Sequence, residues 1–371
     1  MTDQFNPPGG VTSNKTLNNT AVDGGLTLAT GAANVSVGQG ALAANTTGGS
    51  NTAVGNSALN LATVGVHSTA VGVQALQNDT SVGYNTAVGS QALQSNTTGT
   101  GNFAFGRAAL TANTTGIQNG AVGNEAMRVN TAGSNNMACG TYALEYNTIG
   151  NYNCAFGSSA LGQMTAGDKN TAVGWGALDG ASTSSYSTAV GAQALYANLG
   201  TENTAVGASA LVSNTTGGVN SAVGFGAGDG ITTGGGNSIF GATAFTGGTT
   251  GSYNTVIGYN TGLGVTTGAN NTILGAQVTG LAAGLTGAVI LATGDGVIRA
   301  DYGKTNAGAW TLSAGLVTAS YTVATLPAAV AGKRVFVTDL TGASYVFGAT
   351  AVGGGSRGGP VFYSGSAWLE G

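Results

Sequence analysis

The residue types that most often carry acid–base, nucleophilic or metal chemistry are scarce in this chain. Its 371 residues include a single histidine, His67, and two cysteines, Cys139 and Cys154. A catalytic triad or a zinc site built on histidine would therefore depend on His67 alone. His67 has no catalytic partner near it in the sequence, so we expect it to occupy a surface loop.

The two cysteines are better explained as small residues in a repeat than as a reactive pair. Cys139 stands where valine is usual in the repeat described below, and Cys154 stands where threonine is usual. We expect Cys139 to face inward and Cys154 to lie on the other side of its strand. The sequence therefore predicts neither a disulfide nor a shared metal, which agrees with a reducing compartment.

Carboxylates and glycine-rich segments also lack the spacing of known sites. Asp295, Asp301 and Asp339 form no D-x-D-x-D-G calcium loop, so we expect them to cap turns. Gly38 and Gly40 are followed by no P-loop lysine. A glycosidase needs two facing carboxylates, and no pair stands out among the acids of the repeat. These acids are Asp79, Glu125, Glu145, Asp168, Asp179, Glu202 and Asp229. The sequence predicts a protein that is not an enzyme and that has no metal and no cofactor.

The composition excludes further classes. Charged residues make up 6% of the chain, with nine basic and thirteen acidic residues and a net charge of −4. Nucleic-acid binding without clustered basic residues is not expected. No apolar run approaches the roughly 18 residues of a transmembrane helix, so we expect no membrane insertion. The start, MTDQFNPPGG, lacks the regions of a signal peptide. We expect the chain to stay where it is made or to leave by lysis.

An internal repeat positions almost every residue named so far. A glycine recurs fifteen times, and thirteen of the fourteen intervals are 17 residues, while the interval from Gly191 to Gly207 is 16. We call these residues the column glycines: Gly38, Gly55, Gly72, Gly89, Gly106, Gly123, Gly140, Gly157, Gly174, Gly191, Gly207, Gly224, Gly241, Gly258 and Gly275. Asparagine stands four residues before most of them: Asn34, Asn51, Asn85, Asn102, Asn119, Asn136, Asn153, Asn170, Asn203, Asn220, Asn237, Asn254 and Asn271.

The repeat predicts an all-β fold, namely a β-solenoid or β-roll rod with one coil per repeat. Its β-branched residues, together with glycine and asparagine at fixed places, favour short strands joined by turns. We expect the apolar residue before each column glycine, such as Val54, to face inward, along with the leucine four residues after it, such as Leu59. Stacked asparagines would form a ladder along the rod. We expect the register to end after Gly275.

Three regions are predicted: an N-terminal attachment or capping segment at 1–33, the rod at 34–285, and a small C-terminal β module at 286–371. The last region gathers aromatic and basic residues in a chain that is otherwise poor in both types. Such side chains anchor protein or sugar contacts, or they form the core of the module. The candidate receptor-contact residues are Tyr302, Trp310, Tyr321, Arg334, Tyr345, Arg357, Tyr363 and Trp368.

The NTAVGxxAL and NTTG repeats resemble those of bacteriophage tail-fibre and other virion fibre proteins. More distantly, they are similar to the repeats of trimeric autotransporter adhesin heads. The segment VFVTDLTGASYVFGATAVGGGSRGGPVFYSGSAWLEG resembles a C-terminal module of phage fibres. The chain departs from the adhesin pattern because it shows no signal peptide, coiled-coil stalk or anchoring barrel.

The resemblance implies a homotrimeric structural fibre of a phage virion, made in host cytoplasm and released by lysis. A tail fibre would attach to the host, with surface polysaccharide as the receptor class. A capsid decoration fibre and a bacterial surface adhesin are the alternatives. The N-terminal segment would dock on virion tail or capsid proteins.

Overall fold

The computed structural model describes residues 19–22, 33–80, 83–302, 310–312, 320–321, 334–340, 349–350, 357–363 and 368–370. The chain divides into two units, Met1–Ile298 and Arg299–Gly371, and each is considered by itself. Every regular element among the described residues is a β-strand, which confirms the all-β class.

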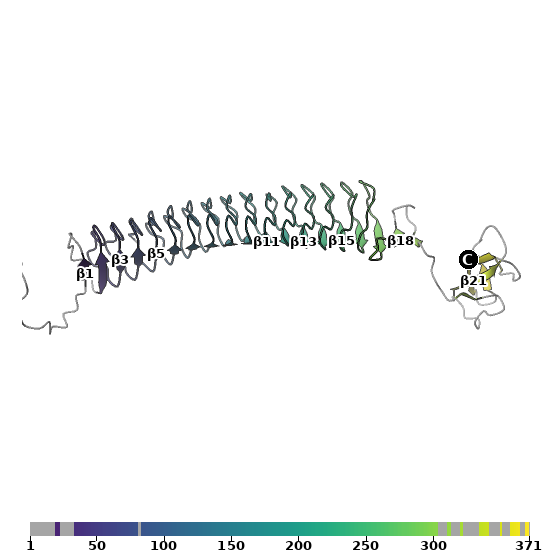
Figure 1. The fold of residues 1–371 in the computed structure, drawn as a ribbon, viewed down its shortest axis with the longest axis horizontal. Coiled ribbons are helices and arrows are strands. Elements are labelled where there is room, and N and C mark those ends of the chain that lie inside the picture. Colours follow the sequence, from purple (N-terminus) through teal and green to yellow (C-terminus); the bar gives the residue numbers. More distant parts are fainter. Residues whose placement is uncertain are drawn as a thin grey trace, which may run out of the picture. The chain divides into compact units, whose positions relative to one another are not determined.

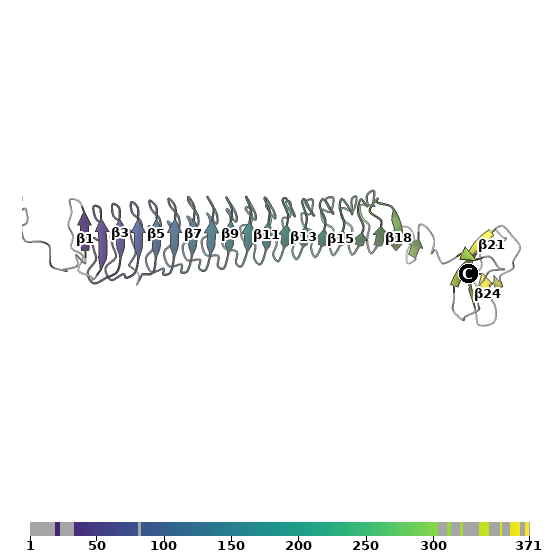
Figure 2. The same cartoon turned by 60° about the horizontal axis from the view of Figure 1, so that its bottom comes forward.

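The first unit is a parallel β-solenoid, as predicted. Its strands lie side by side along a rod, one per coil, and neighbouring strands pair in parallel (Figures 1 and 2). Identical repeat positions pair across coils: Thr52 with Thr69 and Val54 with Val71. The strands are β1 (Asn19–Val22), β2 (Asn34–Val37), β3 (Thr52–Val54), β4 (Thr69–Val71), β5 (Thr86–Val88), β6 (Phe103–Phe105), β7 (Gly120–Val122), β8 (Met137–Cys139), β9 (Cys154–Phe156), β10 (Thr171–Val173), β11 (Thr188–Val190), β12 (Thr204–Val206), β13 (Ser221–Val223), β14 (Ser238–Phe240), β15 (Thr255–Ile257), β16 (Thr272–Leu274) and β17 (Val289–Ala292).

The column glycines turn the chain at the end of each strand. Their φ angles run from +123° at Gly38 to +144° at Gly140, a range that residues with a Cβ rarely adopt. A Cβ added to Gly123 would lie 2.5 Å from the carbonyl oxygen of Gly140 in the next coil. The turn and the close stacking of coils therefore both require glycine here.

The core is built from alanine and leucine, and one prediction about it is wrong. Ala121 and Ala126 are fully buried, as is the predicted inward residue Leu110. The residue before the column glycine faces outward instead, and Phe156 is 55% exposed there. Successive side chains along a strand point to opposite faces. The asparagine four residues before the glycine and the alanine two residues before it are buried, so the residue directly before the glycine points to solvent.

Where the leucine is missing, other side chains fill its space. Gly228 replaces leucine in its coil, and a Cβ at Gly228 would lie 2.8 Å from Cδ1 of Ile239. Ile239 occupies the position that alanine holds in earlier coils. Because a larger residue on the strand compensates for the smaller one in the turn, the core stays filled and the solenoid continues.

The prediction that the register ends after Gly275 is also wrong. The strand β17 pairs in parallel with β16, which places Ile290 beside Ile273. The repeat pattern did not reveal this coil, because Ala292 replaces the column glycine and Ala288 replaces the asparagine. The rod therefore continues beyond residue 285.

The remaining described strands form a different arrangement. The strand β18 (Ile298–Tyr302) pairs with β19 (Trp310–Leu312) in antiparallel orientation. A separate five-stranded sheet has the order β20-β21-β23-β24-β22. Its strands are β20 (Ser320–Tyr321), β21 (Arg334–Leu340), β22 (Ala349–Thr350), β23 (Arg357–Tyr363) and β24 (Trp368–Glu370).

Candidate functional site

The asparagine column before the strands ties each coil to the next. Oδ1 of Asn119 accepts a hydrogen bond from the backbone N–H of Asn136 at 3.0 Å, and Nδ2 of Asn119 donates to the carbonyl of Gly133 at 2.7 Å. These side chains are buried, so they satisfy backbone groups that water cannot reach. The same two bonds, to the next coil's N–H and to the carbonyl fourteen residues on, recur at Asn51, Asn85, Asn102, Asn136, Asn153 and Asn170.

A second asparagine column was missed by the sequence analysis. It lies seven residues after the column glycine, in the NTTG segment. Here side-chain amides bond to one another: Nδ2 of Asn113 donates to Oδ1 of Asn96 at 2.8 Å. The recurrence of asparagine in the repeat was the available signal. Its members are Asn45, Asn96, Asn113, Asn130, Asn147, Asn198 and Asn214.

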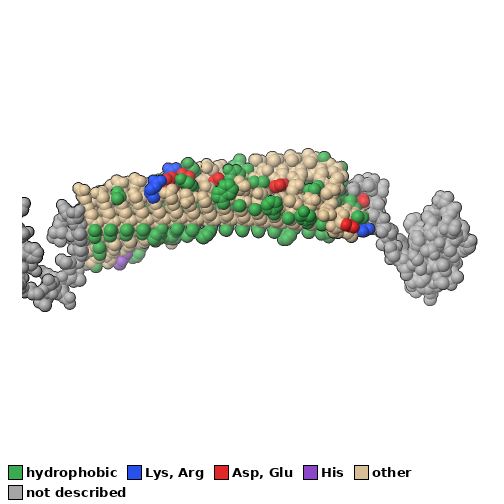
Figure 3. Space-filling view, in the orientation of Figure 1, with side chains coloured by type: hydrophobic (Ala, Val, Ile, Leu, Met, Phe, Trp, Pro, Cys, Tyr) green, Lys and Arg blue, Asp and Glu red, His purple; other side chains and the backbone are tan. Residues whose placement is uncertain are grey.

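The outward face of the sheet carries an apolar stripe along the whole rod. It appears as a continuous green line along the lower edge of the rod (Figure 3). Phe240 is 59% exposed and Leu274 is 46% exposed. We call it the outer stripe, and it contains Val37, Val54, Val71, Val88, Phe105, Val122, Cys139, Phe156, Val173, Val190, Val206, Val223, Phe240, Ile257, Leu274 and Leu291. No charged residue belongs to the outer stripe. Solvent-exposed apolar rows of this length are unusual in a monomer.

A second exposed row, the tyrosine ridge, lies five residues before the column glycines. Its described members include His67, Tyr84, Gln118, Asn135, Tyr152, Lys169, Tyr186, Glu202, Val219, Tyr253 and Asn270. Tyr253 is 69% exposed and has a φ of +57°. Neighbours in this row touch: the His67 and Tyr84 rings stack at 5.4 Å, and Nζ of Lys169 lies 4.8 Å from the Tyr186 ring centroid.

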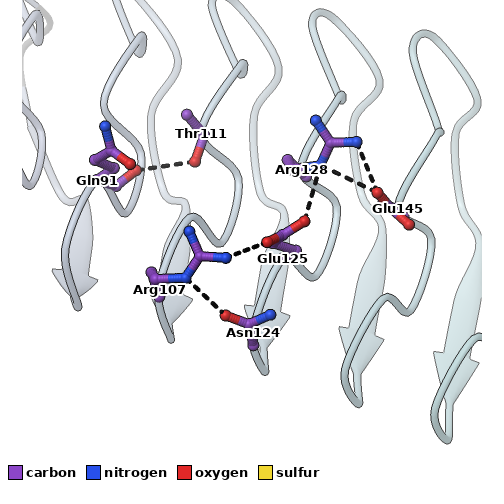
Figure 4. A network of polar contacts seen from close by, with 7 residues as sticks. All are labelled: Gln91, Arg107, Thr111, Asn124, Glu125, Arg128 and Glu145. Atoms are coloured by element: carbon purple, nitrogen blue, oxygen red, sulfur yellow. Dashed lines mark hydrogen bonds and ion pairs between the residues drawn. The ribbon is translucent and has the colours of Figure 1, made fainter.

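Four charged side chains of the rod pair among themselves. Glu125 bridges Arg107 and Arg128, and Arg128 also bonds to Glu145 at 2.7 Å (Figure 4). The hydrogen bond with Glu145 is the main cause that raises the pKa of Arg128 above its ordinary value. Because these cations already have anionic partners, they offer no basic patch to phosphate groups.

Two carboxylates are perturbed by burial. Burial raises the pKa of the Asp179 carboxyl group. It also raises the pKa of Asp229, which is less completely buried. Oδ1 of Asp179 is buried and has no hydrogen-bond partner among the described residues. This oxygen lies 2.4 Å from the position that a Cβ on Gly162 would take, so it packs closely against the neighbouring coil.

The candidate chemical residues are not brought together. His67 is exposed on the tyrosine ridge, and Asp295 accepts a hydrogen bond from the backbone N–H of Val297 at 3.1 Å as a turn residue. The expectation that the cysteines lie on opposite sides is wrong, because Cys139 and Cys154 both point outward on adjacent strands. Both are free thiols. Among the residues that the structure describes, no group of three or more histidine, cysteine, aspartate or glutamate side chains could hold a metal ion.

The candidate receptor-contact residues fall mostly on strands whose backbone alone is described. Tyr302 ends β18 and is partly buried, and Tyr345 lies outside the described residues. The others lie on strands as follows: Trp310 on β19, Tyr321 on β20, Arg334 on β21, Arg357 and Tyr363 on β23, and Trp368 on β24.

Comparison with known proteins gave no relative. No family model, no curated protein and no solved structure matches the chain. Within the described part of the chain, no helix has the length and apolar character needed to cross a membrane. The function must therefore be argued from the rod itself.

Proposed function

We propose that this protein is a non-enzymatic structural fibre of a phage virion, assembled as a homotrimer, and that it serves as a tail fibre in host attachment. The observation that carries the proposal is the outer stripe. An uncharged row of valine, phenylalanine, isoleucine and leucine along every coil loses its contact with water if copies of the rod associate.

Only a partner with the same repeat would cover such a row evenly. Successive coils are about 4.8 Å apart, because that is the spacing of paired strands. A second copy of the chain, lying parallel, presents the same row at the same spacing. Closed rotational symmetry about an axis parallel to the rod then brings the outer stripes of all copies together.

Each of the three parts of the chain has its own role in this proposal. A rod held by backbone ladders is suited to spacing two ends apart. The N-terminal segment at 1–33 would dock on virion tail or capsid proteins, and the chain that follows β17, at 293–371, would meet the host surface, with polysaccharide as the ligand class. Its aromatic and basic residues suit such contacts.

The first test measures self-association of the full chain. Light scattering should give three times the 35.7 kDa chain mass. Val173→Asp and Val190→Asp, which place charges in the outer stripe, should yield monomers that keep a strand-rich circular dichroism spectrum. Thr183→Asp, exposed on another part of the coil, should remain trimeric. A monomeric wild-type chain would contradict the proposal.

The second test places the protein. Antibodies against the rod should label purified phage particles at the tail in electron micrographs. Labelling at the capsid would favour a decoration fibre, and labelling of uninfected bacterial surfaces would favour an adhesin.

A further inference from the structure

The tyrosine ridge is covered only in part by its own chain. Tyr84, Tyr152 and Tyr186 have φ angles of +61°, +57° and +57°, a conformation that costs free energy for bulky residues. Leucines with similar φ angles, such as Leu110, are completely buried, and this burial offsets the cost of their backbone conformation. The ridge tyrosines touch their neighbours in the row, as Tyr84 does with His67 and Tyr186 with Lys169, yet they remain mostly exposed. Contacts within the single chain therefore leave most of their surface available to a partner.

The outer stripe alone is also too narrow for a stable interface. It is about 70 Å long and about 5 Å wide, which gives roughly 350 Å², against about 800 Å² per partner in standard interfaces. The columns on both sides of the stripe must therefore contribute. The tyrosine ridge precedes the strand, and the residue directly after each column glycine follows it. We call this second row the flank column.

Ridge and flank residues of one coil, six positions apart, are complementary in size. In four coils a large ridge residue accompanies a small flank residue, and where the ridge has Gly101 the flank has the large Arg107. The four pairs are Tyr84 with Ser90, Tyr152 with Ser158, Tyr186 with Ala192 and Glu202 with Ala208, whereas Tyr253 with Tyr259 is large on both sides and Gly236 with Ala242 is small on both. Since the two rows project from opposite ends of a strand, crowding within one chain does not explain this relationship.

Other pairs are matched in chemistry rather than in size. Lys169 accompanies Trp175, an arrangement suited to a cation–π contact, and Val219 accompanies the apolar Phe225. Trp175 and Phe225 are both exposed in the single chain. A cyclic arrangement with the sheets facing the axis brings the ridge of one copy against the flank column of the next at the same coil height.

We infer that the tyrosine ridge of each copy packs against the flank column of the neighbouring copy, coil by coil, so that these two rows set the register of the assembly. This inference rests on the homotrimer proposed above. The partner is a second copy of this chain, and the ridge is not a free surface for sugars or other ligands.

Paired cysteines in the full chain test this contact. In a Cys139→Ser, Cys154→Ser background, the double change Tyr152→Cys and Ser158→Cys should be linked between copies by a short bis-maleimide, giving covalent trimers on a denaturing gel. Tyr152→Cys alone should give none. Tyr152→Cys with Gln163→Cys, an exposed position elsewhere on the same coil, should also give none.

The outcomes separate this inference from the proposed function. A trimeric mass without cross-links between positions 152 and 158 would overturn the ridge contact and leave the homotrimer in place. Links between ridge cysteines alone would overturn it as well, because they require ridges to face each other. A monomeric mass in the cysteine-free background and in the wild-type chain would overturn both.

Discussion

The side-chain amide of Asn130 donates a hydrogen bond to Oδ1 of Asn113, one coil away, at 2.7 Å, and both side chains are buried. Together with the column before the strands, this gives the rod two internal polar ladders. Each ladder lies where the backbone turns and its polar groups leave the regular sheet pairing. The rod is therefore held by side-chain amides as well as by its narrow apolar core.

Removing one ladder member should destabilise the rod. Asn119→Leu removes the acceptor of the Asn136 N–H and the donor to the Gly133 carbonyl, leaving both buried without these bonds. We expect a loss of about 1–3 kcal/mol in the free energy of unfolding. Chemical denaturation followed by circular dichroism measures it.

Two variants serve as controls for this prediction. Gln163→Leu makes a similar change at an exposed position outside the ridge and the flank column, and Thr183→Ala truncates an exposed side chain there. Both should stay within about 0.5 kcal/mol of the wild type. Equal losses for Asn119→Leu and Gln163→Leu would mean that the buried column has no structural role.

A methyl group on a column glycine should be far more disruptive than one on a glycine outside the column. Gly123 has a φ of +135° and stacks on the Gly140 carbonyl, so Gly123→Ala combines backbone strain with a clash. We expect a loss greater than about 2 kcal/mol. Gly294, which has open space around its Cβ position, should tolerate alanine. Similar melting temperatures for the two variants would refute the steric argument.

The stability of the rod should respond to Asp179 in a pH-dependent way. Burial raises its pKa above 3.8, so the folded state binds the proton more tightly than the unfolded state does. The folded protein therefore bears a cost above the folded pKa, and the cost disappears as pH falls toward 3.8. Asp179→Asn should raise the melting temperature near neutral pH and lose this advantage in acid.

A matched carboxylate distinguishes this effect from a general change in charge. Asp295→Asn makes the same change at an exposed turn carboxylate outside the ridge and the flank column. It should change the melting temperature little across the same pH range. If Asp179→Asn lowers stability at neutral pH, the buried carboxylate is doing something that its desolvation does not explain.

The sequence predicted the solenoid because the repeat is nearly perfect, yet it placed valine on the wrong face. Most strands of the rod contain an alanine followed by a larger apolar residue, as in Ala53 and Val54. Hydrophobicity alone favours burying the larger of the two. Space decides otherwise: the coil is so thin that only alanine fits between the strand and the opposite turn, where Leu59 fills the core. The outer stripe and the tyrosine ridge could be recognised only after this orientation was known.

The coil with β17 and the second asparagine column were missed for different reasons. In the last coil, Ala292 and Ala288 replace the two residues that marked the repeat, so the pattern fades although the pairing continues. In the second column, residues such as Asn113 stand in a turn-like segment, where asparagine is expected for its backbone preferences. Local turn chemistry thus concealed a contact between coils.

Host binding should depend on the C-terminal module rather than on the rod. If ridge and flank residues are used between copies, the surface left on the rod is dominated by small, uncharged side chains, which make poor anchors. Trp310 and Trp368 lie on β19 and β24, which follow the rod in the sequence. Changing both to alanine should weaken binding of the purified trimer to host cells by about tenfold or more. Tyr196→Ala, which removes an exposed aromatic side chain on the rod outside the ridge and the flank column, should leave cell binding intact, and light scattering should show that all variants keep the wild-type mass. If Tyr196→Ala removes cell binding from an intact trimer while the double variant retains it, the receptor contact lies on the rod.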